Sequence, residues 1–211
     1  YKISVAFILK ILYYISILKQ RSFKMFQIDK QFDFCYGHRV HNQILDKDLS
    51  VDGLCKCRHL HGHNGMLKIG LESNTLERGM VTDFKNLECI KVLVDDILDH
   101  KFIIDINDPL FNDITGVFAE DILWDDYGIG YIKPSVVHDI CTKIADALYG
   151  EAMQDKLEGF VVVDFVPTSE NLCKMFGDIA QQRLSAITGD RVDVAFVDFW
   201  ETPKSHCKYI L

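Results

Sequence analysis

The chain has 211 residues and a mass of 24.3 kDa, and hydrophobic residues make up 48% of it, so it can bury a full core as one domain without disulfide staples. Its formal net charge of -8 argues against a general nucleic-acid binder or a protein of anionic membrane surfaces, because both need a basic face. Its seven cysteines have no regular spacing and an odd count, which argues against a disulfide framework and favours a reducing, cytoplasmic compartment.

Residues 1–24 are expected to lie outside the native fold. They are almost continuously apolar up to Leu18, but Lys10 interrupts the run, which is shorter than the ~20 residues of a membrane-spanning helix. The basic start and small-residue cleavage site of a signal peptide are not clear. We expect the native chain to begin at Met25 as a single domain over 25–211, with a membrane anchor as the weaker alternative.

The first part of that domain predicts two strands and a helix. Apolar residues alternate with polar ones over 26–38 and again over 66–72, which is typical of two antiparallel strands. A turn over 74–79 follows. Asp83 is a suitable N-cap for a helix over 84–98, because apolar residues recur there at three- and four-residue spacing.

The second part is less regular. Residues 105–130 are acidic and loop-like, and a proline start and a glycine stop bound a helix over 134–150. Residues 160–166 read as a buried strand. Thr168 can cap a further helix, which runs to Gly189. The last predicted strand, 192–200, is apolar on both faces, which places it centrally in a sheet with Glu201 at its end.

The stretch from Cys55 to His63 has a high density of residues that can bind a metal ion. Alternate side chains of an extended backbone share a face, and every odd position here is a metal-ligand type. These positions are Cys55, Cys57, His59, His61 and His63. A catalytic zinc takes three protein ligands and a structural one takes four, so some of the five must have another role.

His61 and His63 are the strongest ligand candidates. A His-x-His pair alone arises by chance, but His38 ends a neighbouring strand and adds a third imidazole, leaving the open fourth position of a catalytic zinc. The alternative is a structural site of two cysteines and two histidines within 55–63, which would close a strained loop.

Cys57 lies between Lys56 and Arg58 and four residues before His61. Near a dication its thiol pKa is expected to fall, which would make it a base or nucleophile; the alternative is a thiol without function. The remaining cysteines are most simply small buried hydrophobes. They are Cys35, Cys89, Cys141, Cys173 and Cys207.

Six short motifs occur in order along the chain. They are Phe34-x-x-x-His38, Cys57-x-x-x-His61-Gly62-His63, Gly79-Met80-Val81-Thr82-Asp83-Phe84, Leu98-Asp99-His100, Pro167-Thr168-Ser169-Glu170-Asn171 and Glu201-Thr202. In this order they resemble the 6-pyruvoyl-tetrahydropterin synthase family, which includes the 6-carboxy-tetrahydropterin synthases of queuosine biosynthesis. The resemblance covers 25–109 and 166–211 and does not explain a segment at about 111–164.

The resemblance implies an α+β fold, the T-fold or tunnelling fold. In this fold an antiparallel sheet carries two helices on one face, and the sheets of several subunits join into a barrel with active sites at the subunit interfaces. A homo-oligomer, a trimer or hexamer, is therefore expected. The segment at about 111–164 is expected to be a long helix-containing insertion that decorates the barrel rim or alters how subunits associate.

The resemblance also implies roles for ten residues. The zinc ligands carried over are His38, His61 and His63, and the catalytic residues are Cys57, Asp99 and His100. Glu201 matches the carboxylate that holds the pterin, and Thr168, Ser169 and Glu170 match the helix start that encloses its ring. Cys55 is the alternative thiol, because animal members place theirs farther from the histidines.

The implied function is a zinc-dependent lyase that converts 7,8-dihydroneopterin triphosphate to 6-carboxy-5,6,7,8-tetrahydropterin with loss of acetaldehyde and triphosphate. Lys56, Arg58 and Arg39 are candidates to meet the triphosphate. The first alternative is 6-pyruvoyl-tetrahydropterin synthase, which stops after elimination and internal redox. An alternative of another class is a non-catalytic zinc- and pterin-binding protein that uses the insertion as a partner surface. None of the three requires nucleic acid or a membrane.

Overall fold

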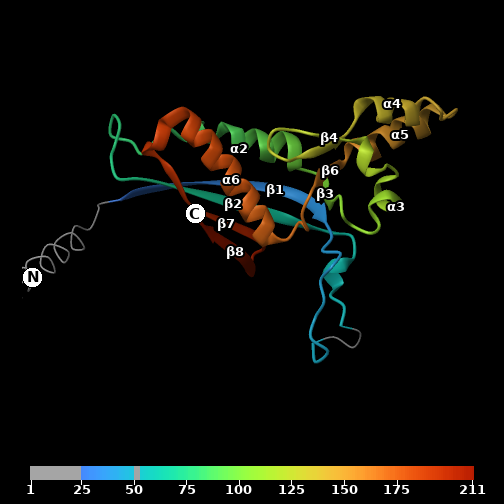
Figure 1. Cartoon of the computed structure of the whole chain (residues 1–211), viewed down its shortest axis with the longest axis horizontal. Helices are drawn as coiled ribbons and strands as arrows, with labels where there is room; N and C mark the ends of the chain where they lie inside the picture. Colours follow the sequence, from blue (N-terminus) through green and yellow to red (C-terminus); the bar gives the residue numbers. More distant parts are fainter. Residues whose placement is uncertain (1–24, 50–52) are drawn as a thin grey trace, which may run out of the picture.

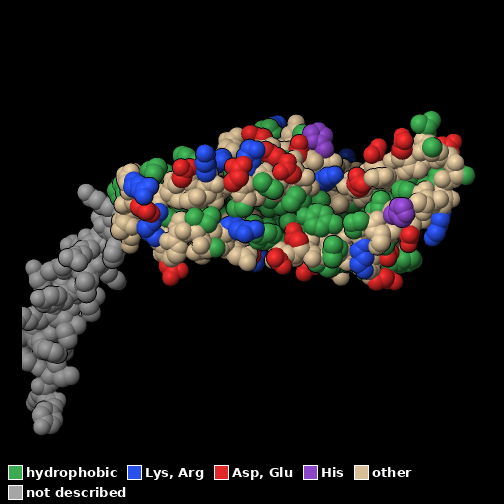
Figure 2. Space-filling model, turned by 90° about the horizontal axis from the view of Figure 1, so that it is seen from above, with side chains coloured by type: hydrophobic (Ala, Val, Ile, Leu, Met, Phe, Trp, Pro, Cys, Tyr) green, Lys and Arg blue, Asp and Glu red, His purple; other side chains and the backbone are tan. Residues whose placement is uncertain are grey.

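The structure, a computed structural model, describes residues 25–49 and 53–211. The leader expected over 1–24 lies outside the described residues. Within the described part, no helix is both long enough and apolar enough to cross a membrane. On the face seen in Figure 2, basic side chains are scattered among acidic ones.

One eight-stranded sheet organises the chain, with the strand order β4-β5-β6-β3-β1-β2-β7-β8 (Figure 1). The strands are β1 Phe26–His38, β2 His61–Ser73, β3 Lys101–Asp105, β4 Ile122–Trp124, β5 Gly130–Ile132, β6 Phe160–Val163, β7 Asp193–Thr202 and β8 Ser205–Ile210. β1, β2, β7 and β8 pair in antiparallel order, whereas β3 runs parallel to both β1 and β6. The predicted pairing of the first two strands and the central place of β7 are confirmed.

Helices cover one face of the sheet, with α6 and α2 lying across it (Figure 1). The α-helices are α2 Glu88–Val92, α3 Phe111–Thr115, α4 Pro134–Cys141, α5 Ala147–Glu158 and α6 Ser169–Thr188. Both predicted N-caps are present: Asp83 Oδ1 accepts from Lys85 N at 2.8 Å, and Thr168 Oγ1 accepts from Asn171 N at 3.3 Å. The helix predicted over 84–98 is irregular, because a 3-10 turn (Phe84–Leu87) precedes α2 and a π-helical stretch (Leu93–Leu98) follows it.

Aromatic rings fill the core between α6 and the sheet. Phe34 of β1 lies 6.1 Å from Phe176 of α6 and 5.9 Å from Phe199 of β7, measured between ring centroids. Phe176 and Phe199 are fully buried. The buried and exposed residues of β1 alternate up to His38, so the even-numbered side chains face the helices and the odd-numbered ones face the bare side of the sheet.

Gly65 of β2 gives a test of this packing. A Cβ added there would lie 3.1 Å from both the Phe199 and the Tyr36 rings, so Gly65→Ala is expected to lower the free energy of unfolding by about 1–3 kcal/mol through overpacking. Denaturant unfolding measures this. Gly150→Ala is the matched control, because Gly150 lies within α5, where the added Cβ would approach only the Cys141 carbonyl oxygen, at 3.7 Å. Equal stability of the two variants would contradict the prediction.

The segment at about 111–164 extends the same sheet through β4, β5 and β6. It packs around a second small core that includes Ile104, Leu157 and Val162. Three predictions here are wrong. Residues 105–130 were predicted as a loop but contain α3 and β4, which are too short to show a hydrophobic period. The single helix predicted over 134–150 is interrupted after Cys141, and Gly150, its predicted end, lies inside α5. The strand predicted to Val166 stops at Val163. Strand β8 was not predicted.

Candidate active site

Three imidazoles meet at the end of the β1–β2 pair. His38 lies opposite His61 in the strand register, and His63 lies opposite Tyr36. Nε2 of His38 is 3.1 Å from Nε2 of His61, and the three ring centroids are 4.5 to 5.1 Å apart. Ligand nitrogens of all three lie within 4.8 Å of one another, so the pairing of two strands alone assembles this cluster.

The surroundings of the cluster orient its nitrogens. His38 Nδ1 lies 2.6 Å from the Pro167 carbonyl oxygen, and His61 Nδ1 lies 2.8 Å from that of His59. A carbonyl can only accept, so each Nδ1 carries the proton and each Nε2 keeps a free lone pair. Nε2 of His63 is buried without a hydrogen-bond partner among the described residues. A buried nitrogen left this way is costly, and it suits a metal ligand.

The charge state of the cluster also suits a metal. Burial lowers the pKa of His38 to about 4, with the other two imidazoles lowering it further against the Pro167 carbonyl. Burial and His61 lower the pKa of His63. These two rings are therefore neutral near pH 7, the form that binds metal. The donor set, neutral imidazoles with an open side, fits Zn²⁺.

Glu201 and Tyr36 lie beside the histidines. Burial and then the charge of Glu170 raise the pKa of Glu201, while His61 and Tyr36 act in the opposite direction. The Tyr36 hydroxyl is buried and has no hydrogen-bond partner within 3.5 Å among the described residues, and burial followed by the nearby Glu201 charge raises its pKa. A carboxylate and a phenol without a full set of partners are available here to a polar ligand.

The start of α6 borders this region. The Thr168 hydroxyl caps the helix, and the Ser169 hydroxyl lies 3.4 Å from Oε2 of Glu170. Because Glu170 influences the pKa of Glu201, this helix start faces the end of β7. The structure thus brings Thr168, Ser169 and Glu170 to the same side of the sheet as the histidines.

The predicted extended backbone over 55–63 is wrong before His61. Cys57 N donates to Cys55 Sγ at 3.5 Å and Arg58 N to the Cys55 carbonyl at 3.1 Å, which closes a 3-10 turn over Lys56–Arg58. Within the described ranges, the groups close enough to share an ion are the three histidines and a Cys35, Asp99 and His100 set. Neither includes Cys55 or Cys57, so the geometry does not support the alternative structural site.

The fall expected for the Cys57 pKa depends on a nearby dication, and in the chain alone the pKa moves in the other direction. Burial raises the pKa of the Cys57 thiol, and Cys55 and then the Glu201 charge raise it further. The flanking bases do not offset this, because Arg58 donates instead to the Gln43 carbonyl at 3.3 Å and Lys56 is exposed. The Glu201 charge acts on the Cys57 thiol, so the two side chains lie near each other.

Asp99 and His100 form an ordered pair at the start of β3. His100 Nδ1 lies 2.8 Å from Asp99 Oδ2, and Asp99 Oδ1 accepts from the backbone N–H of Cys35 at 2.7 Å. That N–H, followed by His100, keeps the Asp99 pKa below its usual range. His100 adopts a left-handed conformation, with φ of 60°, a strained geometry often found at functional positions.

This pair lies on the other face of β1 from the three histidines. The side chain of Cys35 points opposite to those of Phe34 and Tyr36, and its Sγ lies within 4.8 Å of Asp99 and His100. A pocket of about 940 Å³ lies at this end of the sheet and is lined by residues of both groups. Cys35 and His100 line it together with His61, His63 and Glu201.

Three residues were misread from the sequence. Cys35 is partly exposed beside Asp99 and His100, and of the five cysteines expected to be buried only Cys173 is buried. Arg39, a candidate for the triphosphate, instead pairs with the buried Asp108 at 3.0 Å. Tyr36 was not noted, although its place two residues before His38 in an alternating strand puts both side chains on one face.

The model of the family "6-pyruvoyl tetrahydropterin synthase" matches residues 27–210. The chain belongs to this family. It is 33% identical over 195 residues to the 6-carboxy-5,6,7,8-tetrahydropterin synthase of Aquifex aeolicus, which covers 87% of this chain and 96% of that protein. Family membership confirms the expectation of a tetrahydropterin synthase, a lyase, with a histidine cluster able to hold a metal.

Solved structures agree with this. An uncharacterized protein of Wolinella succinogenes is 41% identical, with a TM-score of 0.77 and coverage of 88% of this chain and 98% of that one. A 6-pyruvoyl tetrahydropterin synthase of Plasmodium vivax, 17% identical with a TM-score of 0.51 over 88% and 97% of the two chains, confirms the T-fold. The match to the Aquifex protein spans 87% of this chain and therefore runs across residues 111–164.

Proposed function

We propose that the protein is a zinc-dependent lyase that converts 7,8-dihydroneopterin triphosphate to 6-carboxy-5,6,7,8-tetrahydropterin in the 7-deazaguanine pathway to queuosine. The observation that carries the metal part is the convergence of His38, His61 and His63, with two Nδ1 atoms bound to carbonyls and a buried, unpartnered His63 Nε2. The similarity to the Aquifex synthase supports the choice of product.

Each group of site residues has its own role in the proposed reaction. Zn²⁺ held by the three histidines would supply a Lewis acid that acidifies the carbon next to a bound substrate hydroxyl. Cys57 takes up that proton as a thiolate, and its raised pKa in the metal-free chain means that a nearby positive charge must lower it. Glu201 binds the N–H groups of the pterin, which offsets the cost of its burial. Thr168, Ser169 and Glu170 enclose the ring.

Asp99 and His100 act as a proton relay, with Asp99 orienting His100 through Nδ1. Because this pair and the three histidines lie on opposite faces of β1 in one chain, we propose that each active site takes His38, His61, His63 and Cys57 from one subunit and Asp99–His100 from a neighbour. This arrangement would require a homo-oligomer, and the family resemblance favours a trimer or hexamer.

The test of the product is release of acetaldehyde. Zinc-loaded protein incubated with 7,8-dihydroneopterin triphosphate is expected to release acetaldehyde and triphosphate in equal amounts, measured by an aldehyde-coupled assay and by mass spectrometry of the pterin. Triphosphate without acetaldehyde would favour the alternative product, 6-pyruvoyl-tetrahydropterin. Release of neither would contradict a lyase and leave a non-catalytic pterin-binding protein as the remaining candidate.

A further inference from the structure

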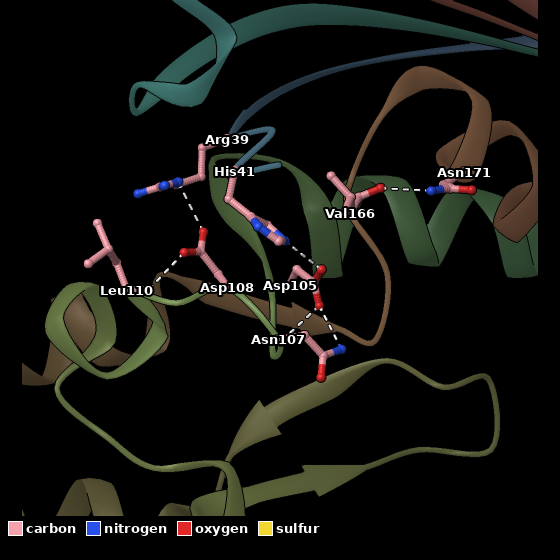
Figure 3. A network of polar contacts seen from close by, with 8 residues as sticks. All are labelled: Arg39, His41, Asp105, Asn107, Asp108, Leu110, Val166 and Asn171. Carbon is pink, nitrogen blue, oxygen red and sulfur yellow. Dashed lines mark hydrogen bonds and ion pairs between the residues drawn. The ribbon is translucent and has the colours of Figure 1, made fainter. Parts of the chain in front are cut away.

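Two polar contacts link the base of the β1–β2 loop to the last residue of β3 and to the turn that follows it (Figure 3). Arg39 Nε lies 3.0 Å from Asp108 Oδ2, and His41 Nε2 lies 3.0 Å from Asp105 Oδ2. All four side chains are nearly buried, with exposed fractions of 11% for Arg39 and His41, 1% for Asp108 and 4% for Asp105. The contacts join parts of the chain that are far apart, since His41 and Asp105 are separated by 64 positions.

The acceptors are themselves held in place. Asp105 Oδ1 accepts from the backbone N–H and the side-chain amide of Asn107, at 2.9 and 3.1 Å. Asp108 Oδ1 accepts from the Leu110 N–H at 2.9 Å. Each carboxylate therefore uses one oxygen to fix its own turn and offers the other to the loop, as the dashed lines in Figure 3 show.

Val40, which lies between Arg39 and His41 in the chain, forms a backbone hydrogen bond with Cys57. The Val40 N–H donates to the Cys57 carbonyl at 2.8 Å, so the backbone of Cys57 is tied to the point that Arg39 and His41 anchor on either side. Beyond this point the loop projects away from the sheet (Figure 1), and Ile44 is 77% exposed. The base of the loop is thus tied through Arg39 and His41 to the end of β3 and the β3–α3 turn, and through Val40 to Cys57.

We propose that Asp105 and Asp108 are positioning residues, which act through His41 and Arg39 to set the place of the Cys57 thiol. A buried ion pair stabilises a fold no better than well-packed apolar side chains of similar volume, but it has a defined geometry, which is what a reacting group needs. The inference rests on the proposed function for the role of Cys57. It assigns to the β3–α3 turn a part in the reaction that the motifs did not indicate.

Asp108→Asn tests this, because the amide keeps the shape and the oxygen that accepts from Leu110, while an NH2 group replaces the charged oxygen that Arg39 faces. We expect kcat to fall about 10-fold, within the ~100-fold that an ångström of misplacement can cost, with KM changed less than about twofold. Alkylation of Cys57 by iodoacetamide, followed by peptide mass spectrometry, should change in rate while metal content stays at the parent level. Asp108→Glu should recover part of kcat.

Asp178→Asn is the matched control, because Asp178 pairs with Lys174 on the exposed side of α6, and it should change neither kcat nor the alkylation rate. Asp108→Asn with both quantities within twofold of the parent would overturn the proposal. If Asp108→Asn does not fold, the apolar pair Arg39→Met with Asp108→Leu replaces it, and parent-like Cys57 reactivity in that variant would overturn the proposal too. Absence of lyase turnover in the parent would contradict the proposed function alone, since the alkylation rates still test the anchoring.

Discussion

His63→Ala is expected to abolish both metal binding and turnover. The variant should bind less than about a tenth of the parent's zinc, and kcat/KM should fall at least about 10³-fold, equivalent to about 4 kcal/mol of transition-state stabilisation. The reason is that His63 Nε2 is buried beside His38 and His61 and has no hydrogen-bond partner among residues 25–49 and 53–211, so its main interaction would be with the metal. Elemental analysis of the purified protein measures the first quantity, and the acetaldehyde assay measures the second.

The same variant separates a metal ligand from a structural histidine. A histidine that served packing would lower stability when removed, but His63 has an unsatisfied buried nitrogen in the metal-free chain, and its removal relieves that cost. We therefore expect the metal-free variant to unfold at a denaturant concentration close to that of the metal-free parent. Only the stabilisation that zinc adds to the parent should be missing.

His59→Ala is the control for His63→Ala. His59 lies in the same ligand-rich stretch and is exposed, and only its backbone carbonyl contacts His61, so the alanine variant should keep its zinc and its activity. Loss of zinc from His59→Ala, or full zinc content in His63→Ala, would contradict the assignment of the ligands.

The sequence predicted the histidine cluster because its geometry follows from one regular feature. β1 and β2 are long alternating strands, and in a paired hairpin of such strands the register decides which side chains meet. His38 opposite His61 is therefore a consequence of the period of two. The caps at Asp83 and Thr168 were predictable for a similar reason, since each depends on a hydrogen bond over two or three residues.

Features that depend on irregular backbone or on distant contacts were not predictable. The 3-10 turn at 56–58 ends the alternation because the Cys55 sulfur and carbonyl compete with strand hydrogen bonds. Arg39 looked like a free base because its acceptor, Asp108, lies far along the chain. Cys35 looked like a core residue because the neighbouring strand β3, which brings Asp99 and His100 beside it, is not adjacent in sequence.

Cys57→Ala and His100→Asn are each expected to lower kcat by about 10³-fold with little change in KM, because both remove groups that move protons and neither binds the ground state. The aldehyde assay at saturating substrate measures this. Cys55→Ala is the control for the thiol, and it should stay within about threefold of the parent, since the motif pattern places the reactive thiol at Cys57. Loss of activity in Cys55→Ala with parent-like activity in Cys57→Ala would assign the proton transfer to Cys55. Parent-like activity in both variants would show that neither thiol moves the proton.

Mixing the two inactive variants tests whether the site is shared between subunits. In a single chain the Asp99–His100 pair lies on the face of β1 opposite His38, and under the proposed function a complete site takes His100 from one chain and Cys57 from another. When equal amounts of Cys57→Ala and His100→Asn chains are unfolded together and refolded, random pairing leaves about a quarter of the sites with both groups intact. Activity should therefore return to about a quarter of the parent value. If native mass spectrometry shows mixed oligomers and activity does not return, the two groups do not come from different subunits.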